Sequence, residues 1–216
     1  MHIRLAELFL SGEEETAVDF IEKHLNEHPR MYLYEDIITP AMYHIGELWE
    51  NNEISVADEH LATAVCDFVL SKIENTSYPM STKKLGDRKV MLLGIENERH
   101  YIGLKMVSSY FKEKNWRVRY LGPDLPIDHA IKQIDKWKPD VIGLSAALSY
   151  RLPVLKVFIE RFSKLEWQPD ILVGGRITRK YDLTDMYDDH VHFIRGLNDL
   201  DKWLVDRKEG IKDGTS

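Results

Sequence analysis

The chain has 216 residues, of which 44% are hydrophobic and 30% are charged, as is usual for folded globular proteins. This length is comfortable for two small domains. The formal net charge at pH 7 is −7, and no long run of Lys and Arg occurs. Because contacts with phosphates need clustered basic side chains, direct nucleic-acid binding is not expected.

A single cysteine, Cys66, excludes an intramolecular disulfide and a cysteine-based metal cluster. The first residues lack the apolar core of a signal peptide. No apolar stretch approaches the ~20 residues that span a bilayer. We therefore expect a cytoplasmic protein that has no membrane segment.

The first 75 residues carry apolar side chains at helical spacing. We expect helices near residues 5–10, 11–25 and 32–48, and a fourth from about residue 55. Ser11 and Glu14 have the spacing of a capping box, and Pro40 should begin or kink the third helix. Short joints between the helices favour an antiparallel four-helix bundle.

A polar stretch over residues 76–87, which contains Pro79 and Gly86, is the predicted linker. From residue 88 to residue 216, short apolar segments alternate with helical patterns. Strands are expected at 90–94, 116–121, 140–145, 171–173 and 192–194, with Gly122-Pro123 ending the second. Helices are expected near 101–114, 126–137, 152–162 and 200–205. This alternation predicts a doubly wound, flavodoxin- or Rossmann-like, five-stranded parallel sheet.

Ligands of such sheets bind outside the carboxyl ends of the strands, where the strand order reverses. For the order 2-1-3-4-5, this crevice lies between strands 1 and 3. Three segments of the sequence meet there: residues 98–103 after strand 1, residues 145–148 at the end of strand 3, and Gly174-Gly175 after strand 4.

The chemistry of these residues suits a metal-containing ligand. His100 offers an imidazole nitrogen to a transition metal, and Glu98 can accept the other ring N–H and fix the tautomer. Gly103 and Gly174-Gly175 allow a ligand to approach the backbone, while Ser145 offers a small hydroxyl. Each residue alone also has an ordinary interpretation, namely a surface histidine, a solvated charge or a turn glycine. No Gly-x-Gly-x-x-Gly loop and no Walker-type lysine loop is present.

Together, Glu98-x-His100-x-x-Gly103, Ser145 and Gly174-Gly175 resemble the cobalamin-binding domain of methionine synthases, corrinoid proteins and cobalamin-dependent regulators. Glu98 stands where that family usually has Asp. Ala147 departs from the Leu or Thr that usually lies two residues after the motif serine.

The helical half resembles one branch of this family. Trp49, nine further residues and then Glu59-His60 are similar to the Trp-x9-Glu-His motif of cobalamin photoreceptors and light regulators. Glu50 departs from the histidine that follows the tryptophan in the best-known light-sensing members, and the usual N-terminal DNA-binding domain does not precede the helical part.

The resemblance implies cobalamin as the cofactor and cobalt as the metal, with His100 as the lower axial ligand. The nucleotide tail is then expected in the α/β domain, and the helical cap over residues 1–75 is expected to cover the upper face of the cofactor. Adenosylcobalamin is favoured as the bound form, with methylcobalamin as the other form considered. The implied cofactor-binding residues are Trp49, Val56, Glu59, His60, Glu98, His100, Tyr101, Ile102, Gly103, Ser145, Leu148, Gly174 and Gly175.

The sequence leaves several functions open. The resemblance favours a light- or cofactor-responsive sensor that acts through a regulatory protein partner or by self-association. The alternative is a corrinoid protein that carries methyl groups for a methyltransferase system. A third interpretation is a module that has kept the fold without the cofactor. An independent enzyme is not expected, because no Ser-His-Asp order, second metal cluster or convincing pair of carboxylates is found.

Overall fold

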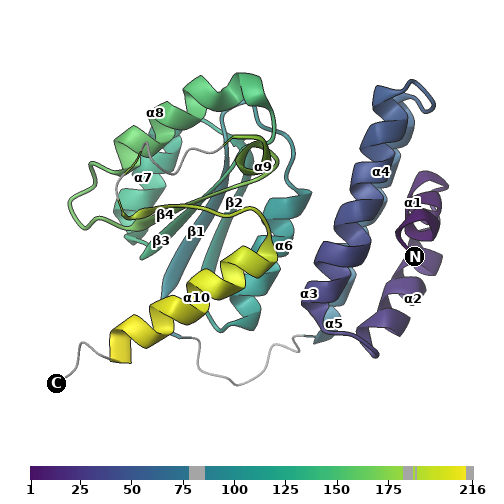
Figure 1. The fold of residues 1–216 in the computed structure, drawn as a ribbon, viewed down its shortest axis with the longest axis horizontal. Coiled ribbons are helices and arrows are strands. Elements are labelled where there is room, and N and C mark those ends of the chain that lie inside the picture. The colour runs from purple at the N-terminus through teal and green to yellow at the C-terminus, as the bar shows by residue number, and fades with distance from the viewer. Residues whose placement is uncertain (78–85, 182–186, 188, 213–216) are drawn as a thin grey trace. The chain divides into compact units, whose positions relative to one another are not determined.

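The chain divides into two compact units, Met1–Lys83 and Lys84–Ser216. The computed structural model describes residues 1–77, 86–181, 187 and 189–212 (Figure 1). Residues 78–85 of the predicted linker lie outside the described residues. Each unit buries its own set of apolar side chains.

The first unit is helical. Helix α1 contacts α4 and α5, and α2 contacts α5, so that the apolar faces of the long helices meet in one core. The elements are α1 (His2–Leu10), α2 (Glu14–Leu25), α3 (Arg30–Tyr32), the π-helical segment η1 (Leu33–Ile38), α4 (Thr39–Glu50) and α5 (Val56–Ser77).

Two helix starts show how local chemistry sets the boundaries. The predicted capping box at Ser11 and Glu14 is wrong: the Ser11 hydroxyl donates back to the carbonyl of Glu7 at 2.8 Å and so closes α1. A reciprocal cap occurs at α5 instead, where the Ser55 N–H donates to the Asp58 carboxylate and the Asp58 N–H donates to the Ser55 hydroxyl. Pro40 lies in the first turn of α4, as expected.

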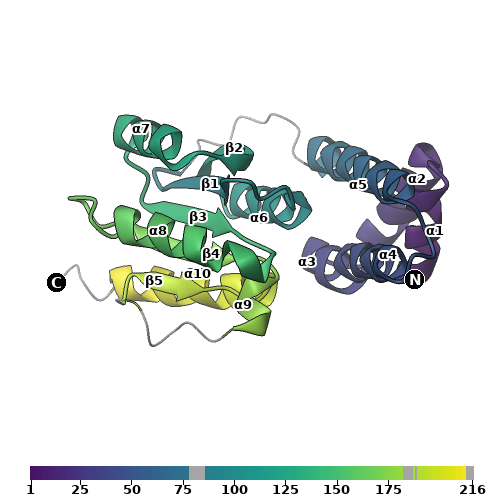
Figure 2. The same cartoon turned by 90° about the horizontal axis from the view of Figure 1, so that it is seen from above.

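The second unit contains a parallel sheet in the order β2-β1-β3-β4-β5, which confirms the predicted topology. Helices α6 and α10 cover one face of the sheet and α7 and α8 cover the other (Figures 1 and 2). The strands are β1 (Lys89–Ile95), β2 (Arg117–Leu125), β3 (Val141–Ser145), β4 (Asp170–Gly174) and β5 (Val191–Phe193). The helical elements are α6 (Ile102–Glu113), α7 (Ile127–Trp137), η2 (Ser149–Arg151), α8 (Leu152–Phe162), α9 (Ile177–Lys180) and α10 (Leu197–Lys212).

Central and edge strands differ in burial. Strands β1 and β3 are buried almost throughout because helices cover both faces, which explains their continuous apolar runs. Strand β2 lies at an edge of the sheet and exposes Arg117 and Arg119, charges that protect an edge from further strand pairing.

The carboxyl end of β2 differs from the prediction. The strand does not end at Gly122-Pro123 but continues to Leu125. Its pairing with β1 shifts register between Leu92 and Leu93 and again between Leu93 and Ile95. Gly122 and Asp124 have φ of +80° and +55°, a conformation that allows such irregular pairing. The irregularity carries β2 along the loop that follows β1.

Candidate functional site

Strand register brings three small residues together at the carboxyl edge of the sheet. Gly94 at the end of β1 pairs with Ser145 at the end of β3, and Ser145 pairs with Gly174 at the end of β4. We call these three residues the small-residue shelf. The shelf runs across the carboxyl ends of β1, β3 and β4. The order of strands reverses between β1 and β3, so the predicted segments do meet at one edge of the sheet.

The side chain of Glu98 joins the loop after β1 to the end of β3. It is fully buried, and its Oε1 accepts hydrogen bonds from the His100 backbone N–H at 2.9 Å and from His100 Nδ1 at 2.5 Å. Its Oε2 accepts the Ala147 N–H at 2.7 Å. One carboxylate therefore holds the His100 ring, the Ala147 backbone and the loop over residues 96–101, which we call the ligand loop after the predicted ligand His100.

These hydrogen bonds keep Glu98 ionised. Burial raises the pKa of the carboxyl, but the hydrogen bonds from the His100 ring, the Ala147 N–H and the His100 N–H outweigh it and lower the pKa to about 2. The anionic carboxylate is the acceptor, so Nδ1 of His100 carries the proton. The other ring nitrogen, Nε2, is not used by Glu98, and the His100 side chain is 48% exposed. A histidine whose Nδ1–H is held by a carboxylate is oriented to bind a metal through Nε2.

The contact with Ala147 explains why the departure from the family motif is harmless to this network. Glu98 uses the backbone N–H of Ala147 and not its side chain. The identity of the side chain two residues after Ser145 therefore does not affect this hydrogen bond. Sequence comparison alone treats the position as a mismatch.

The predicted glycines meet very different surroundings. A Cβ added at Gly103 in the first turn of α6 would meet nothing within 4 Å, so the backbone there borders open space. At Gly175, φ is +102° and an added Cβ would lie 2.2 Å from the carbonyl oxygen of Ala146. Gly175 therefore serves the close packing of β3 against the turn after β4, whereas Gly103 leaves room for a ligand.

The remaining predicted residues of this unit border the same edge. Tyr101 is the N-cap residue of α6, Ile102 begins that helix, and Leu148 precedes η2; all three are partly exposed. Among the described residues, no group of three or more His, Cys, Asp and Glu side chains that could hold a metal ion is found. A single oriented imidazole could serve as the protein's ligand to a cobalt ion that a corrin already holds.

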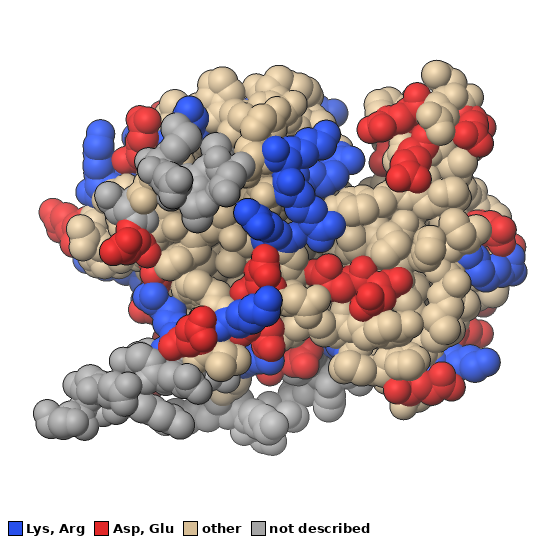
Figure 3. Space-filling view, in the orientation of Figure 1, with Lys and Arg blue, Asp and Glu red and all other residues tan. Residues whose placement is uncertain are grey.

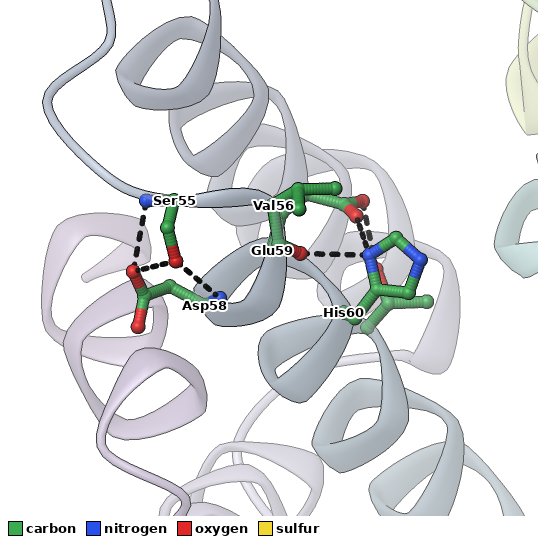
Figure 4. A network of polar contacts seen from close by, with 6 residues as sticks. Ser55, Val56, Asp58, Glu59 and His60 are labelled. Carbon is green, nitrogen blue, oxygen red and sulfur yellow. Dashed lines mark hydrogen bonds and ion pairs between the residues drawn. The ribbon is translucent and has the colours of Figure 1, made fainter.

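Val56, Glu59 and His60 lie in the first turns of α5 (Figure 4), and Trp49 is next to the last residue of α4. The His60 Nδ1 donates to the Val56 carbonyl at 2.7 Å and lies 3.0 Å from the Glu59 carboxylate. The other Glu59 oxygen accepts the Thr63 hydroxyl at 3.1 Å. Trp49 is 47% exposed, so it is not a core tryptophan. The exposed indole and imidazole are available to a ligand or a partner.

Formal charge separates the two units. Residues 1–83 contain 16 acidic and 5 basic side chains, a net charge of −11, whereas residues 84–216 contain 20 and 24, a net charge of +4. On the face drawn in Figure 3, Lys and Arg gather over α9, while Asp and Glu dominate the charged positions of the helical unit. The basic residues of α9 are Arg179 and Lys180, next to the turn that follows β4. Of the helices that the structure describes, none is long and apolar enough to cross a membrane.

Comparison with protein families identifies the chain. A B12 binding domain family matches residues 88–196, and a second family, also described as a B12 binding domain, matches residues 3–74. The first match covers half of the chain. The chain belongs to the B12-binding domain family and binds cobalamin.

Individual relatives are distant and differ in their roles. A methionine synthase of Mycobacterium leprae is 22% identical over 89% of this chain, which spans only 17% of that protein. Dimethylamine corrinoid protein 3 of Methanosarcina acetivorans is 25% identical over 79% of this chain and 80% of its own length. The HTH-type transcriptional repressor CarH of Myxococcus xanthus is 23% identical over 85% of this chain and 60% of its own.

Solved structures share the fold. The monomethylamine corrinoid protein of Methanosarcina barkeri superposes with a TM-score of 0.74, covering 94% of this chain and 96% of its own, at 14% identity. The methanol:cobalamin methyltransferase complex MtaBC of Methanosarcina barkeri gives a TM-score of 0.51. The predicted succession of a helical part and a Rossmann-like parallel sheet is thereby confirmed.

Several observations within the α/β unit fit cobalamin. The donor set offers one oriented imidazole, the small-residue shelf carries little side-chain bulk, and the backbone at Gly103 borders open space. Sequence reasoning found His100, Gly103, Ser145 and Gly174 but missed three others: Gly94 of the shelf, Ala147, which acts through its backbone, and Asp124, whose carboxylate accepts the Asn97 N–H at 2.6 Å. A polar residue at the end of a strand on the ligand-binding edge was the available signal for Asp124.

Proposed function

We propose that this chain holds cobalamin with His100 as the lower cobalt ligand and serves as a methyl-carrying corrinoid protein for a methyltransferase partner. The observation that carries the cofactor mode is the buried Glu98 carboxylate, which holds Nδ1 of His100 and leaves Nε2 free to bind metal. When bound, cobalamin supplies a cobalt centre that accepts and releases a methyl group.

The chain's own residues have distinct parts in this proposal. His100 donates its Nε2 lone pair, and Glu98 keeps the proton on Nδ1 and raises the basicity of the ligand. The open backbone at Gly103 leaves space for the nucleotide tail, and the small side chain of Ser145 and the glycine at position 174 border it. In this proposal the partner methyltransferase provides the catalytic residues.

Coverage of the relatives favours the carrier over the sensor. The dimethylamine corrinoid protein matches over 80% of its own length, so the compared region contains most of what that protein has. The repressor CarH matches over 60% of its length, and the rest of that protein has no counterpart in the aligned region. The two units described therefore correspond to more of the corrinoid protein than of the repressor.

A second candidate is a sensor of adenosylcobalamin. The half-exposed Trp49, together with Glu59 and His60 at the start of α5, favours it. An indole can stack on an adenine base, while a carboxylate and an imidazole can hydrogen-bond its sugar. Such a sensor would act by self-association or through a regulatory partner, because the bound cofactor favours one of two arrangements.

The cofactor mode is tested by absorbance and binding titrations with methylcobalamin and adenosylcobalamin in the dark. We expect stoichiometric binding and a histidine-ligated spectrum for the wild type. His100→Ala should lose that spectrum and bind at least roughly 100-fold more weakly, since a metal ligand matters more than its supporting partners. His129→Ala, which changes an exposed histidine on α7, is the matched control and should behave as wild type.

The same samples separate carrier from sensor. A carrier should bind methylcobalamin at least as tightly as adenosylcobalamin and keep its size on illumination, measured by light scattering after size-exclusion chromatography. Strong preference for adenosylcobalamin, with a change of assembly after green light, would replace the carrier with the sensor. Wild-type spectra from His100→Ala would reject the proposed ligand.

A further inference from the structure

One side chain from the edge strand β2 reaches the ligand loop. Asp124, near the end of β2, accepts the backbone N–H of Asn97 with Oδ1 at 2.6 Å. Its own backbone N–H donates to the Glu98 carbonyl at 3.0 Å. The two hydrogen bonds bracket the dipeptide Asn97-Glu98.

This dipeptide determines where the Glu98 side chain points. The Glu98 N–H donates to the Ile95 carbonyl at 2.9 Å, which closes a tight turn directly after β1. Asn97, at the third position of the turn, has φ of +61°, a left-handed conformation that Asn and Gly tolerate best. The turn directs Glu98 into the interior, where its carboxylate meets the Ala147 N–H and the His100 ring.

Close packing at the end of β1 supports the two hydrogen bonds of Asp124 to Asn97 and Glu98, which we call the Asp124 clamp. A Cβ added at Gly94 would lie 3.0 Å from the Cα of Pro123, 3.4 Å from the Glu98 carbonyl oxygen and 3.5 Å from the Asp124 nitrogen. The irregular pairing of β2 with β1 brings Asp124, itself at φ of +55°, over the turn. The last residues of β2, the end of β1 and the ligand loop therefore contact one another continuously.

We infer that Asp124 is a positioning residue for the cobalt ligand: its carboxylate holds the Asn97-Glu98 turn and thereby sets the orientation of the His100 imidazole. The inference rests on the proposed role of His100. It assigns a function to β2, an edge strand that contributes no residue to the predicted cofactor site.

The test uses three variants of the full chain. Asp124→Gly removes the carboxylate and keeps a residue that accepts positive φ, and Asp124→Asn restores an oxygen that can accept the Asn97 N–H. Lys138→Gly changes another positive-φ residue, at the end of α7, and is the matched control. The variants are produced in cells supplied with ¹⁵N-histidine and are loaded with cob(II)alamin. The electron paramagnetic resonance spectrum of cob(II)alamin then reports whether a histidine nitrogen binds the cobalt.

We expect Asp124→Gly to lower the share of histidine-ligated cobalt and to weaken cobalamin binding by up to roughly 10-fold, as for an outer-shell partner of a metal ligand. Asp124→Asn should recover most of the signal, and Lys138→Gly should match the wild type. A wild-type spectrum from Asp124→Gly, when His100→Ala has lost the histidine signal, overturns the inference and leaves the proposed function intact. A wild-type spectrum from His100→Ala rejects the proposed function itself.

A measurement on the unmodified protein covers the case in which Asp124→Gly does not fold. The Asn97 amide should be protected from hydrogen exchange and shifted downfield by its short hydrogen bond to a carboxylate. Exchange at the rate of an unstructured amide would show that the clamp does not hold, and the inference would be abandoned.

Discussion

Two histidines of this chain, one in each unit, make similar Nδ1 hydrogen bonds in opposite settings. In both, Nδ1 faces oxygen acceptors. Among the described residues, Val56 and Glu59 hold His60, within one turn of its own helix, and its side chain is 75% exposed. His100 is held by Glu98, whose carboxylate also binds Ala147 in the segment after β3, 49 residues further along the chain.

The difference separates a site that is arranged before the ligand arrives from one that remains adjustable. Fixing His100 in advance lowers the entropy that binding would otherwise cost. His60 and Trp49 are exposed to 75% and 47%, so their side chains can change rotamer at little cost in packing. Charge follows the same division, since the helical unit carries −11 and the α/β unit +4. One unit thus carries a histidine held by a buried network, and the other carries exposed side chains.

The largest effect is expected where the α/β network is broken at its centre. Glu98→Gln places an amide N–H opposite a backbone or ring donor, which should cost on the order of 1–3 kcal/mol of folding free energy. Cobalamin affinity should fall by roughly 10- to 100-fold. Urea unfolding of the apoprotein and cofactor titration measure the two effects.

The dependence of folding stability on acid pH should also change in the Glu98→Gln variant. The folded pKa of Glu98, about 2, is below its usual 4.5, so its stabilisation is complete above that usual value and is lost as the pH falls towards 2. Glu98→Gln should remove this part of the acid dependence, whereas Asp128→Asn, which breaks an exposed ion pair with Arg161, should retain it. Equal acid profiles for wild type and Glu98→Gln would contradict a preformed network.

An intermediate effect should separate two glycines of the same unit. Gly175→Ala should destabilise the apoprotein by about 2 kcal/mol or more, because φ is +102° and the new Cβ would overlap the Ala146 carbonyl. Gly103→Ala should leave the apoprotein unchanged or stabilise it by up to about 1 kcal/mol, since the position is helical and open. It should nevertheless weaken cobalamin binding if the nucleotide tail occupies that space. Unchanged affinity in Gly103→Ala would move the tail elsewhere.

The smallest effect on folding is expected in the helical unit. Trp49→Ala should change the free energy of unfolding by less than about 0.5 kcal/mol, because the side chain is half exposed. Its effect should appear in the ratio of affinities for adenosylcobalamin and methylcobalamin, with Tyr43→Ala on the same helix as control. A loss of stability comparable to that of Gly175→Ala would show that Trp49 is a structural residue and remove the contrast between the two histidines.

Much of the architecture follows from sequence pattern because it depends on local chemistry. Apolar periodicity locates the helices, and alternating strands and helices predict the parallel sheet and its order. The pairing of Glu98 with His100 is also local, since the two residues are only two positions apart. The small-residue shelf follows once the strand order is known, because parallel strands end at the same edge.

Other features depend on contacts between distant segments. No pattern indicates that the Glu98 carboxylate binds Ala147, that β2 continues past Gly122-Pro123, or that Asp124 holds Asn97. Ser11 closes one helix and does not cap the next, because its hydroxyl has two competing sets of backbone partners. The exposure of Trp49 likewise depends on how α4 packs in its bundle. The sequence by itself determined the fold class and singled out His100 as the proposed cobalt ligand, since periodicity and short spacing are local properties. Only the tertiary structure decided what fixes that histidine, because the groups that hold it come from the segment after β1, the segment after β3 and strand β2.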